Sequence, residues 1–344
     1  MATSHDENSC DSDLSRDSVL TRHGLGHSVL HQYQGFWSYA KAIENVKDFQ
    51  QNFNALDTDV IITTLPKSGT TWLKALAFAI VNRTSYSPSS SSSHQHHPLL
   101  TTSPHDLVPF VDFKHRYPAN YSLLDFTKTS TCHDSPCRLI STHVPYPSLP
   151  ESIKSTATDC KIVYLCRNPQ DNFISLWLFM NKFIGTMQEN NSGDRSPPLS
   201  IEEAFEYFCA GVSLSGPFWD HVLGYWTKSL EEPRKVLFLK YEDLKKEPEI
   251  HCKRLAEFMG CRFSVEEENQ GAVDEIVKLC SFQNLKNLDL NKSGTTSRFH
   301  FKNEDFYRKG EVGDWKNYLT PPMVERLDRL LEEKLQGSGL VFPN

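Results

Sequence analysis

The stretch Leu65-Pro66-Lys67-Ser68-Gly69-Thr70-Thr71-Trp72 joins two apolar segments through a short polar loop. The β-branched run at 59–64 before it predicts a buried strand, and the segment from Trp72 to Val81 predicts a helix that is apolar on nearly every side. Gly69 lets a ligand approach the backbone, and the helix N-terminus carries a partial positive charge. Together with the ammonium group of Lys67, the loop is therefore suited to bind an anion such as a phosphate.

The loop is not a Walker A motif, although both join a strand to a helix. That motif requires Gly-x-x-x-x-Gly-Lys-[Ser/Thr], whereas no glycine lies five residues before Gly69 and Lys67 precedes the glycine. A P-loop nucleotide kinase or NTPase is still an alternative, because Glu242-Asp243 follows an apolar run in the manner of a Walker B acid. An ordinary strand–turn–helix connection with a chance lysine is the structural alternative.

The composition limits the classes of partner. The 344 residues carry a net charge of −7 and a pI of about 6.1, which argues against a nucleic-acid backbone or an anionic membrane as the main partner. The polar start at 1–17 lacks the segments of a signal peptide, and no apolar run approaches the length of a membrane span. The nine cysteines are scattered without a paired C-x-x-C motif, which is typical of a reducing compartment. We therefore expect a cytoplasmic protein.

The chain divides into a tail and one domain. Residues 1–28 are polar with little periodicity, so we expect a disordered N-terminal tail, followed by a single domain at 29–344. Within the domain, the low-complexity segment at 85–98 is rich in serine and histidine and predicts a mobile surface loop. Because a flexible tract lacks preformed ligand geometry, its histidines do not predict a metal site, and we expect none in the chain.

Three further strands and several helices follow the opening loop. Apolar runs predict strands at 138–142, 161–166 and 236–240. One helix is predicted with Asn168 as its cap and Pro169 in its first turn, and it runs through Phe173 to Phe179. Further helices are predicted from a capping box formed by Ser200 with Glu203, and at 248–259, 264–280 and 321–335. Strands that alternate with helices predict an α/β fold, a single domain with a mainly parallel central sheet flanked by helices.

Side chains suited to an anion stand where the predicted strands end. Lys67 follows the first strand, His143 the second, Arg167 the third and Lys240-Tyr241 the fourth. Because ligands bind beyond the carboxyl ends of the strands in such sheets, these groups converge on one rim. Ser175 lies two helical turns after Arg167 and returns to the same side.

His143 is the candidate general base. A lone histidine is more often a structural residue, but this one ends a predicted strand just before a proline-bounded turn. Its unperturbed pKa of about 6.5 lets it accept a proton from a hydroxyl near neutral pH, a role that contributes roughly 10²- to 10⁴-fold in rate.

A second anion site is predicted near the end of the chain. Arg308 and Lys309 stand beside Gly310, which permits a turn whose backbone N–H groups join the two cations. A solvated pair of loop charges is the alternative. Two separated phosphate sites in an acidic protein indicate one ligand that carries phosphate at two positions.

Taken together, these motifs resemble the cytosolic sulfotransferases over about residues 33–340, and their order and spacing match as well. The phrases at 103–110 and 216–219 resemble the plant branch of that family in particular. The matching motifs are Pro66-Lys67-Ser68-Gly69-Thr70-Thr71-Trp72, Thr142-His143-Val144-Pro145, Tyr164 to Asp171 with Ser175, Lys240-Tyr241-Glu242-Asp243-Leu244, and Arg308-Lys309-Gly310-x-x-Gly313-Asp314-Trp315.

The resemblance implies 3′-phosphoadenylyl sulfate (PAPS) as donor, without a metal, and a P-loop-like phosphosulfate-binding loop. His143 and Lys67 would be the catalytic residues. The loop that would bind the 5′-phosphosulfate consists of Lys67, Ser68, Gly69, Thr70, Thr71 and Trp72. The residues that would bind the 3′-phosphate are Arg167, Ser175, Arg308, Lys309 and Gly310. The residues that would contact the adenine are Trp72, Tyr241 and Phe282.

The chain departs from the family pattern at three places. Cys280 stands before Phe282 where many members have threonine, which weakens the expected stacking on the adenine. Ser141 replaces the lysine that many animal members carry two positions before the histidine, so no second catalytic lysine is expected. Pro321 replaces valine in the dimer motif of the animal enzymes, so we expect a monomer or a weak homodimer.

The acceptor is expected to be a small molecule with a hydroxyl group, first of all a flavonoid or another phenol. Aromatic residues at 33–37 and 107–113 either line its pocket or belong to the core. Hydroxyjasmonates, brassinosteroids and desulfoglucosinolates are alternative acceptors, because the donor motifs do not separate them. A protein that binds adenosine 3′,5′-bisphosphate (PAP) without catalysing a reaction is the alternative to an enzyme.

Overall fold

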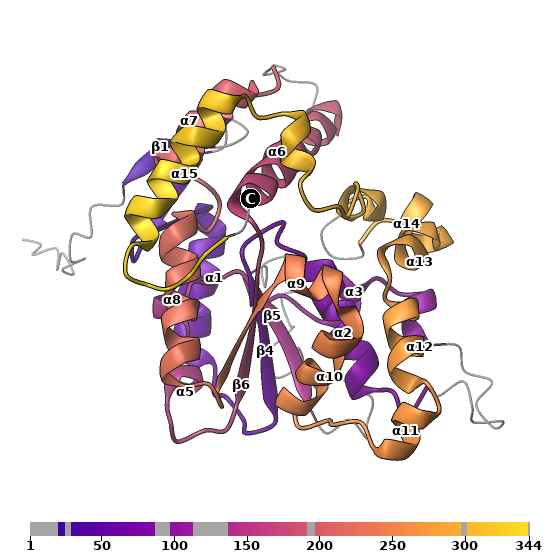
Figure 1. Ribbon diagram of the computed structural model, residues 1–344. Coiled ribbons are helices and arrows are strands. Elements are labelled where there is room, and N and C mark those ends of the chain that lie inside the picture. Colours follow the sequence, from indigo (N-terminus) through magenta and orange to yellow (C-terminus); the bar gives the residue numbers. More distant parts are fainter. Residues whose placement is uncertain are drawn as a thin grey trace, which may run out of the picture.

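The computed structural model describes residues 20–24, 29–86, 97–112, 137–190, 197–296 and 301–342, with the backbone alone at 184–190. Its centre is a four-stranded sheet in the order β5-β4-β6-β7, in which all strands are parallel (Figure 1). The strands are β4 (Asp59–Thr64), β5 (Arg138–Thr142), β6 (Lys161–Cys166) and β7 (Val236–Lys240). The predicted strands and the predicted α/β fold are confirmed.

Helices cover both faces of the sheet. Figure 1 shows α1 and α8 on one side of it and α2, α9 and α10 on the other. The α-helices are α1 (Ala40–Asn52), α2 (Thr70–Val81), α3 (Pro104–Leu107), α5 (Glu151–Lys154), α6 (Pro169–Asn190), α7 (Ile201–Cys209), α8 (Phe218–Glu231), α9 (Tyr241–Lys246), α10 (Pro248–Phe258), α11 (Val265–Asn269), α12 (Ala272–Leu279), α13 (Phe282–Asn287), α14 (Asp289–Ser293) and α15 (Pro321–Leu335). The 3₁₀ turns are η1 (Pro98–Leu100), η3 (Tyr146–Ser148), η4 (Asn303–Phe306) and η5 (Asp314–Asn317).

Alternate residues of each central strand enter two different cores, because successive side chains point to opposite faces. In β4, Ile61 belongs to the core that contains Phe49 of α1 and residues of α6, α7, α8 and α15. Its neighbours Val60 and Ile62 pack with the apolar helix α2 and with α10 and α12. Burial on both faces explains why the strands read as continuous apolar runs.

The strand order creates a crevice at one edge of the sheet. β5 lies on one side of β4, whereas the next strand in the chain, β6, lies on the other side. The connections that leave β4 and β6 therefore diverge to opposite sides, and such a switch point opens a crevice at the carboxyl ends of the two strands. Lys67 follows β4 and Arg167 follows β6, so both cations stand at this crevice.

A small antiparallel sheet packs against Val212 and Leu214, which follow α7, and it changes the expectation for the N-terminal tail. It contains β1 (Thr21–His23), β2 (Val29–Tyr33) and β3 (Phe36–Ser38). The tail expected at 1–28 is thus wrong for β1, which pairs with β2 as an edge strand. The rest of that tail lies outside the described residues, as does most of the loop predicted at 85–98.

Two helix predictions need correction, and one helix is missing from the prediction. The helix predicted at 264–280 divides into α11 and α12, because Gly271 adopts the left-handed conformation with φ of 79°. The helix predicted to run from Pro169 through Phe179 begins at Pro169 but continues to Asn190 in α6. Helix α8 was not predicted, although its buried residues Phe218, Val222 and Tyr225 follow a helical spacing.

Two further observations complete the fold. The capping boxes at Ser200 and Ser264 are both present. Among the described residues, no helix is long and apolar enough to cross a bilayer.

A buried ion pair ties β5 to β4. The Asp59 side chain is fully buried and accepts hydrogen bonds from the guanidinium of Arg138, which is 12% exposed. Replacing Arg138 with Met leaves a buried carboxylate without its cation, so we expect the free energy of unfolding to fall by about 3 kcal/mol in urea denaturation. Arg329→Met is the control, because that side chain is 71% exposed and its pair with Glu325 contributes about 0.5 kcal/mol or less. Equal unfolding midpoints for the two variants would contradict a structural role for the buried pair.

Candidate active site

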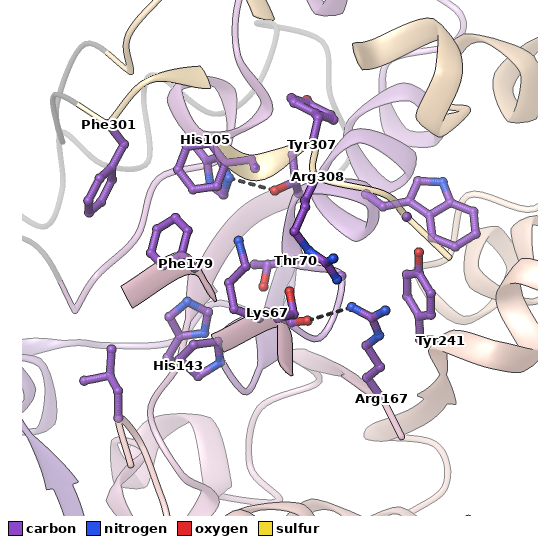
Figure 2. A pocket seen from close by; sticks show the side chains of 18 of the residues that line it. Lys67, Thr70, His105, His143, Arg167, Phe179, Tyr241, Phe301, Tyr307 and Arg308 are labelled. Atoms are coloured by element: carbon purple, nitrogen blue, oxygen red, sulfur yellow. Dashed lines mark hydrogen bonds between the residues drawn. The ribbon is translucent and has the colours of Figure 1, made fainter. Parts of the chain in front are cut away.

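A cavity of about 350 Å³ opens at the carboxyl ends of the strands. Figure 2 shows Lys67 between His143 and Phe179 on one side and Arg167 and Arg308 on the other. The lining includes these predicted site residues: Lys67, Gly69, Thr70, Thr71, Trp72, His143, Arg167, Ser175, Tyr241, Phe282, Arg308, Lys309 and Gly310. Ser68 is a fully buried residue of the same loop and does not line the cavity. The fold therefore brings together predicted site residues that are spread over more than 240 positions of the chain.

The loop between β4 and α2 is held in a strained but well-supported conformation. Lys67 and Gly69 both have positive φ, at 67° and 104°. A Cβ at Gly69 would lie 2.8 Å from the Tyr241 ring, so glycine is required there for conformation and for space. Asn172 of α6 fixes the loop from below by donating hydrogen bonds to Pro66 O at 2.8 Å and to Ser68 Oγ at 3.1 Å.

Lys67 occupies an electrostatically unfavourable position. Burial, together with the positive charges of Arg167 and Arg308, lowers its pKa from 10.5 to about 7, although Asp305 acts in the opposite sense. Its Nζ lies 4.0 Å from the centre of the Phe179 ring. An anion in the cavity would balance these cations and restore the charge on Lys67.

Arg167 is positioned by the backbone and by an aromatic ring. It donates a hydrogen bond to Glu311 O at 2.7 Å, and its guanidinium carbon lies 4.8 Å from the centre of the Tyr241 ring. Its Nε is buried and has no hydrogen-bond partner among the described residues, and the same holds for Nε of Arg308. Unsatisfied buried donors on two cations that line one cavity are consistent with an anionic ligand.

The second predicted anion site is built around one carboxylate. Arg308 and Lys309 both donate to Asp314, each at 2.5 Å. Burial alone would raise the pKa of Asp314, but hydrogen bonds from Lys309, Arg308 and Asn317 lower it to about 2. The two cations therefore exceed the single carboxylate by one positive charge. Asp171 anchors the turn to α6 by accepting a hydrogen bond from the backbone N–H of Gly313 at 2.7 Å.

Flat aromatic side chains line the cavity beside the cations, and Figure 2 shows Tyr241 next to Arg167 on the side away from Lys67. Trp72 and Tyr241 meet edge to face with ring centres 5.5 Å apart. Gly310 has φ of 67°, and a Cβ there would lie 2.4 Å from the Phe282 ring, so the backbone lies directly against that ring. These rings are suited to hold a planar group such as a nucleobase.

His143 is held in the tautomer that a general base needs. Its Nδ1 lies 2.7 Å from Thr64 O, which can only accept, so the proton is on Nδ1 and Nε2 is left to take up another. Burial, with the nearby charges of Lys74 and Lys67, lowers the pKa of His143 to about 3. The free site therefore contains a neutral imidazole at pH 7.

The backbone of His143 is fixed as firmly as its ring. Its N–H donates to the buried carboxylate of Asp112, and its carbonyl accepts from His221 Nε2 at 3.1 Å. The Tyr164 hydroxyl donates to Nδ1 of His221 at 2.9 Å, which sets the tautomer of that second histidine.

An aromatic wall completes the cavity, and most of it was not predicted. Phe110 was expected, from the segment 107–113, and its ring lies 4.8 Å from that of His143. Phe113 lies outside the described residues, and residues 33–37 line a smaller adjoining cavity through Tyr33, Phe36 and Trp37. The unpredicted apolar members are Phe179, Met180, Phe183, Phe301 and Phe306. The four-residue spacing of Phe179 and Phe183 was the available signal for α6.

Comparison with known proteins gives a consistent assignment. The family model described as "Sulfotransferase domain" matches residues 57–339. Cytosolic sulfotransferase 15 of Arabidopsis thaliana is 46% identical over 97% of this chain and 88% of its own length, and cytosolic sulfotransferase 8 of the same plant is 48% identical over 90% and 87%. The names of these relatives agree with the cytoplasmic location expected from the sequence.

Solved structures extend the similarity to the whole fold. The crystal structure of an Arabidopsis thaliana protein described as a steroid sulphotransferase candidate is 41% identical, with a TM-score of 0.68 over 95% of this chain and 93% of that one. Mouse sulfotransferase SULT7A1, crystallised with PAP, is 24% identical and shares the fold with a TM-score of 0.62 over 90% and 95%. The matched length and the identity decide against the nucleotide kinase alternative. The chain belongs to the sulfotransferase family and is a sulfotransferase.

Proposed function

We propose that the protein transfers the sulfuryl group of PAPS to a hydroxyl of a small aromatic acceptor, with His143 as general base. One observation carries the proposal: a single cavity contains two cationic sites, flat aromatic rings beside them, and a neutral imidazole beside an aromatic wall. The PAP found with the mouse relative carries phosphate at two positions, which fits two cationic sites. The buried Nε donors of Arg167 and Arg308 fit such an anion as well.

The donor is assigned to the cavity residues as follows. The loop from Lys67 to Trp72 would hold the 5′-phosphosulfate, because it combines backbone N–H groups, hydroxyls and an ammonium group. The rings of Trp72, Tyr241 and Phe282 would hold the adenine. The residues assigned to the 3′-phosphate are Arg167, Ser175, Arg308, Lys309 and Gly310.

His143 and Lys67 divide the chemistry between them. The acceptor O–H gives its proton to Nε2 of His143 while its oxygen forms a bond to sulfur. The bond from sulfur to the bridging phosphate oxygen breaks, and Lys67 stabilises the charge that gathers on that oxygen, as in the related phosphoryl transfers. A phenol with a pKa near 10 is mostly protonated at pH 7, so a base is needed. Each charge-assisted hydrogen bond contributes about 1.5–3 kcal/mol, more than the helix dipole.

The aromatic wall supports a phenolic acceptor. Phe110 lies against His143, and Phe179 lies 4.0 Å below the ammonium of Lys67, so both rings contact a catalytic group. A flat acceptor packed on these rings would present its hydroxyl to Nε2 of His143. We therefore propose a flavonoid or a similar phenol. We further propose that the protein acts as a monomer or weak homodimer, away from membranes and nucleic acids.

A panel of acceptors with radiolabelled PAPS tests the proposed function. We expect labelled product from flavonols, and less from a hydroxyjasmonate, a brassinosteroid and a desulfoglucosinolate at equal concentration. Product from one of those three alone would overturn the phenolic acceptor but keep the reaction. No product from any hydroxyl compound, together with magnesium-dependent hydrolysis of ATP, would contradict the reaction itself.

His143→Ala separates chemistry from binding. Without the base, we expect the transfer rate to fall by about 10²- to 10⁴-fold, while the dissociation constant of PAP changes less than about 2-fold. His251→Ala is the matched control, because His251 lies on α10 outside the cavity lining and should leave both quantities unchanged. A normal transfer rate in His143→Ala would refute the assigned base.

The lowered pKa of Lys67 predicts that ligand binding takes up a proton. In the free protein its pKa is about 7, so at pH 8 the ammonium is mostly deprotonated. Bound phosphate would raise that pKa, and the affinity for PAP should therefore decrease as pH rises above 7. Calorimetry of PAP binding at pH 8 in buffers of different ionisation enthalpy should show uptake of about one proton.

Two variants make this measurement specific. Lys67→Met should abolish the proton uptake and weaken PAP binding, whereas Lys245→Met, at another lysine of the cavity lining, should retain the uptake. Proton uptake that persists in Lys67→Met would assign it to another group.

A further inference from the structure

A buried histidine that the proposed mechanism does not use contacts the phosphosulfate loop. His105 of α3 is 4% exposed and lies in the wall of the cavity, on the same side as Phe179 and Phe301 in Figure 2. Its ring stacks on Phe110 with centres 5.7 Å apart and lies 4.3 Å from the ring of Phe306. The orientation of the imidazole is therefore fixed, and the contacts of its two nitrogens determine which of them carries the proton.

The two nitrogens meet groups of different character. Nδ1 lies 3.4 Å from Nζ of Lys74, and Nε2 lies 2.9 Å from Oγ1 of Thr71. Lys74 is itself fully buried in α2, where its ammonium donates to Val108 O at 2.9 Å and lies 3.2 Å from the centre of the Phe110 ring. An ammonium group has donors only, so Nδ1 of His105 must accept and the imidazole proton must be on Nε2.

This tautomer determines the direction of the Thr71 hydroxyl. Nε2–H donates to Oγ1 of Thr71, so the hydrogen of that hydroxyl cannot point back at His105. It meets no acceptor among the residues that the structure describes, and Thr71 lines the cavity. The hydrogen is thus left to donate to an anion held by the loop.

We propose that His105 is a positioning residue, which receives a hydrogen bond from Lys74 and orients the Thr71 hydroxyl toward the anionic phosphosulfate end of the donor. This inference rests on the proposed donor. His105 does not touch the reacting atoms, and it acts through Thr71. Lys74 is 0% exposed and does not line the cavity, whereas His105 does, so the imidazole of His105 also separates the ammonium from the ligand site. Burial and the charge of Lys74 lower the pKa of His105, which keeps that imidazole neutral.

Calorimetric titration with PAP tests the proposal without any catalytic step. His105→Phe keeps the stacked ring but removes both nitrogens, and we expect PAP binding to weaken about 10-fold, the value of one charge-assisted hydrogen bond. His105→Gln retains an amide N–H for Thr71 and a carbonyl for Lys74, so it should bind within about 3-fold of the native protein. The acceptor KM should not change in either variant.

A double-mutant cycle identifies the path through Thr71. Thr71→Val removes the hydroxyl that His105 orients, so the double variant of His105→Phe and Thr71→Val should bind PAP no more weakly than Thr71→Val alone. Losses that simply add would overturn the proposal, because His105 would then act independently of Thr71. Unchanged binding in His105→Phe would overturn it too.

Nuclear magnetic resonance of the native protein provides a test that needs no variant. Long-range proton–nitrogen spectra distinguish protonated from unprotonated imidazole nitrogens, and we expect His105 to carry its proton on Nε2. A proton on Nδ1 would contradict the relay from Lys74. If the native protein does not bind PAP at all, the proposed donor fails, whereas native binding with an unaffected His105→Phe rejects only the role of His105.

Discussion

The site depends on the repulsion between cations that the fold places at the ends of neighbouring parallel strands. Lys67 follows β4 and Arg167 follows β6. The two strands are paired up to Thr64 and Leu165, so the segments that follow them leave the sheet side by side. Burial and the positive charges of Arg167 and Arg308 outweigh Asp305 and lower the pKa of Lys67 to about 7. In the free protein these like charges repel one another, and a doubly phosphorylated ligand would relieve that repulsion, which would link the topology of the sheet to the proposed donor.

The proposed base, His143, is held by the same sheet. β5 carries His143 to the rim, where Thr64 O of the neighbouring strand sets its tautomer and Asp112 binds its backbone N–H. His221 supports the carbonyl from α8. These contacts come from the main chain or from buried side chains, so the imidazole faces the aromatic wall with little freedom to turn. The anion site and the base are thus fixed relative to each other by strand pairing rather than by mobile loops.

Local signals explain what could be predicted from the sequence. The bounds of the four central strands could be predicted to the residue, because the strands are short apolar runs bounded by polar turns. The convergence of Lys67, His143 and Arg167 could be predicted because the carboxyl ends of parallel strands lie at one edge of the sheet. The aromatic wall was largely missed, because Phe179, Phe301 and Phe306 become neighbours only when distant segments pack. The contact of His105 with Thr71 spans 34 residues and has no periodic pattern to reveal it. Gly271 divides a helix that its flanking apolar spacing suggested to be continuous.

The central claim is that one crevice binds both phosphates of a single ligand, and a comparison of two nucleotides tests it most directly. Adenosine 3′,5′-bisphosphate and adenosine 5′-monophosphate differ only by the 3′-phosphate, which Arg167 and Arg308 would bind. Calorimetry measures the affinity of the protein for each. Two charge-assisted hydrogen bonds of about 1.5 kcal/mol each predict that the bisphosphate binds at least about 100-fold more tightly. Equal affinity for the two nucleotides would contradict the claim.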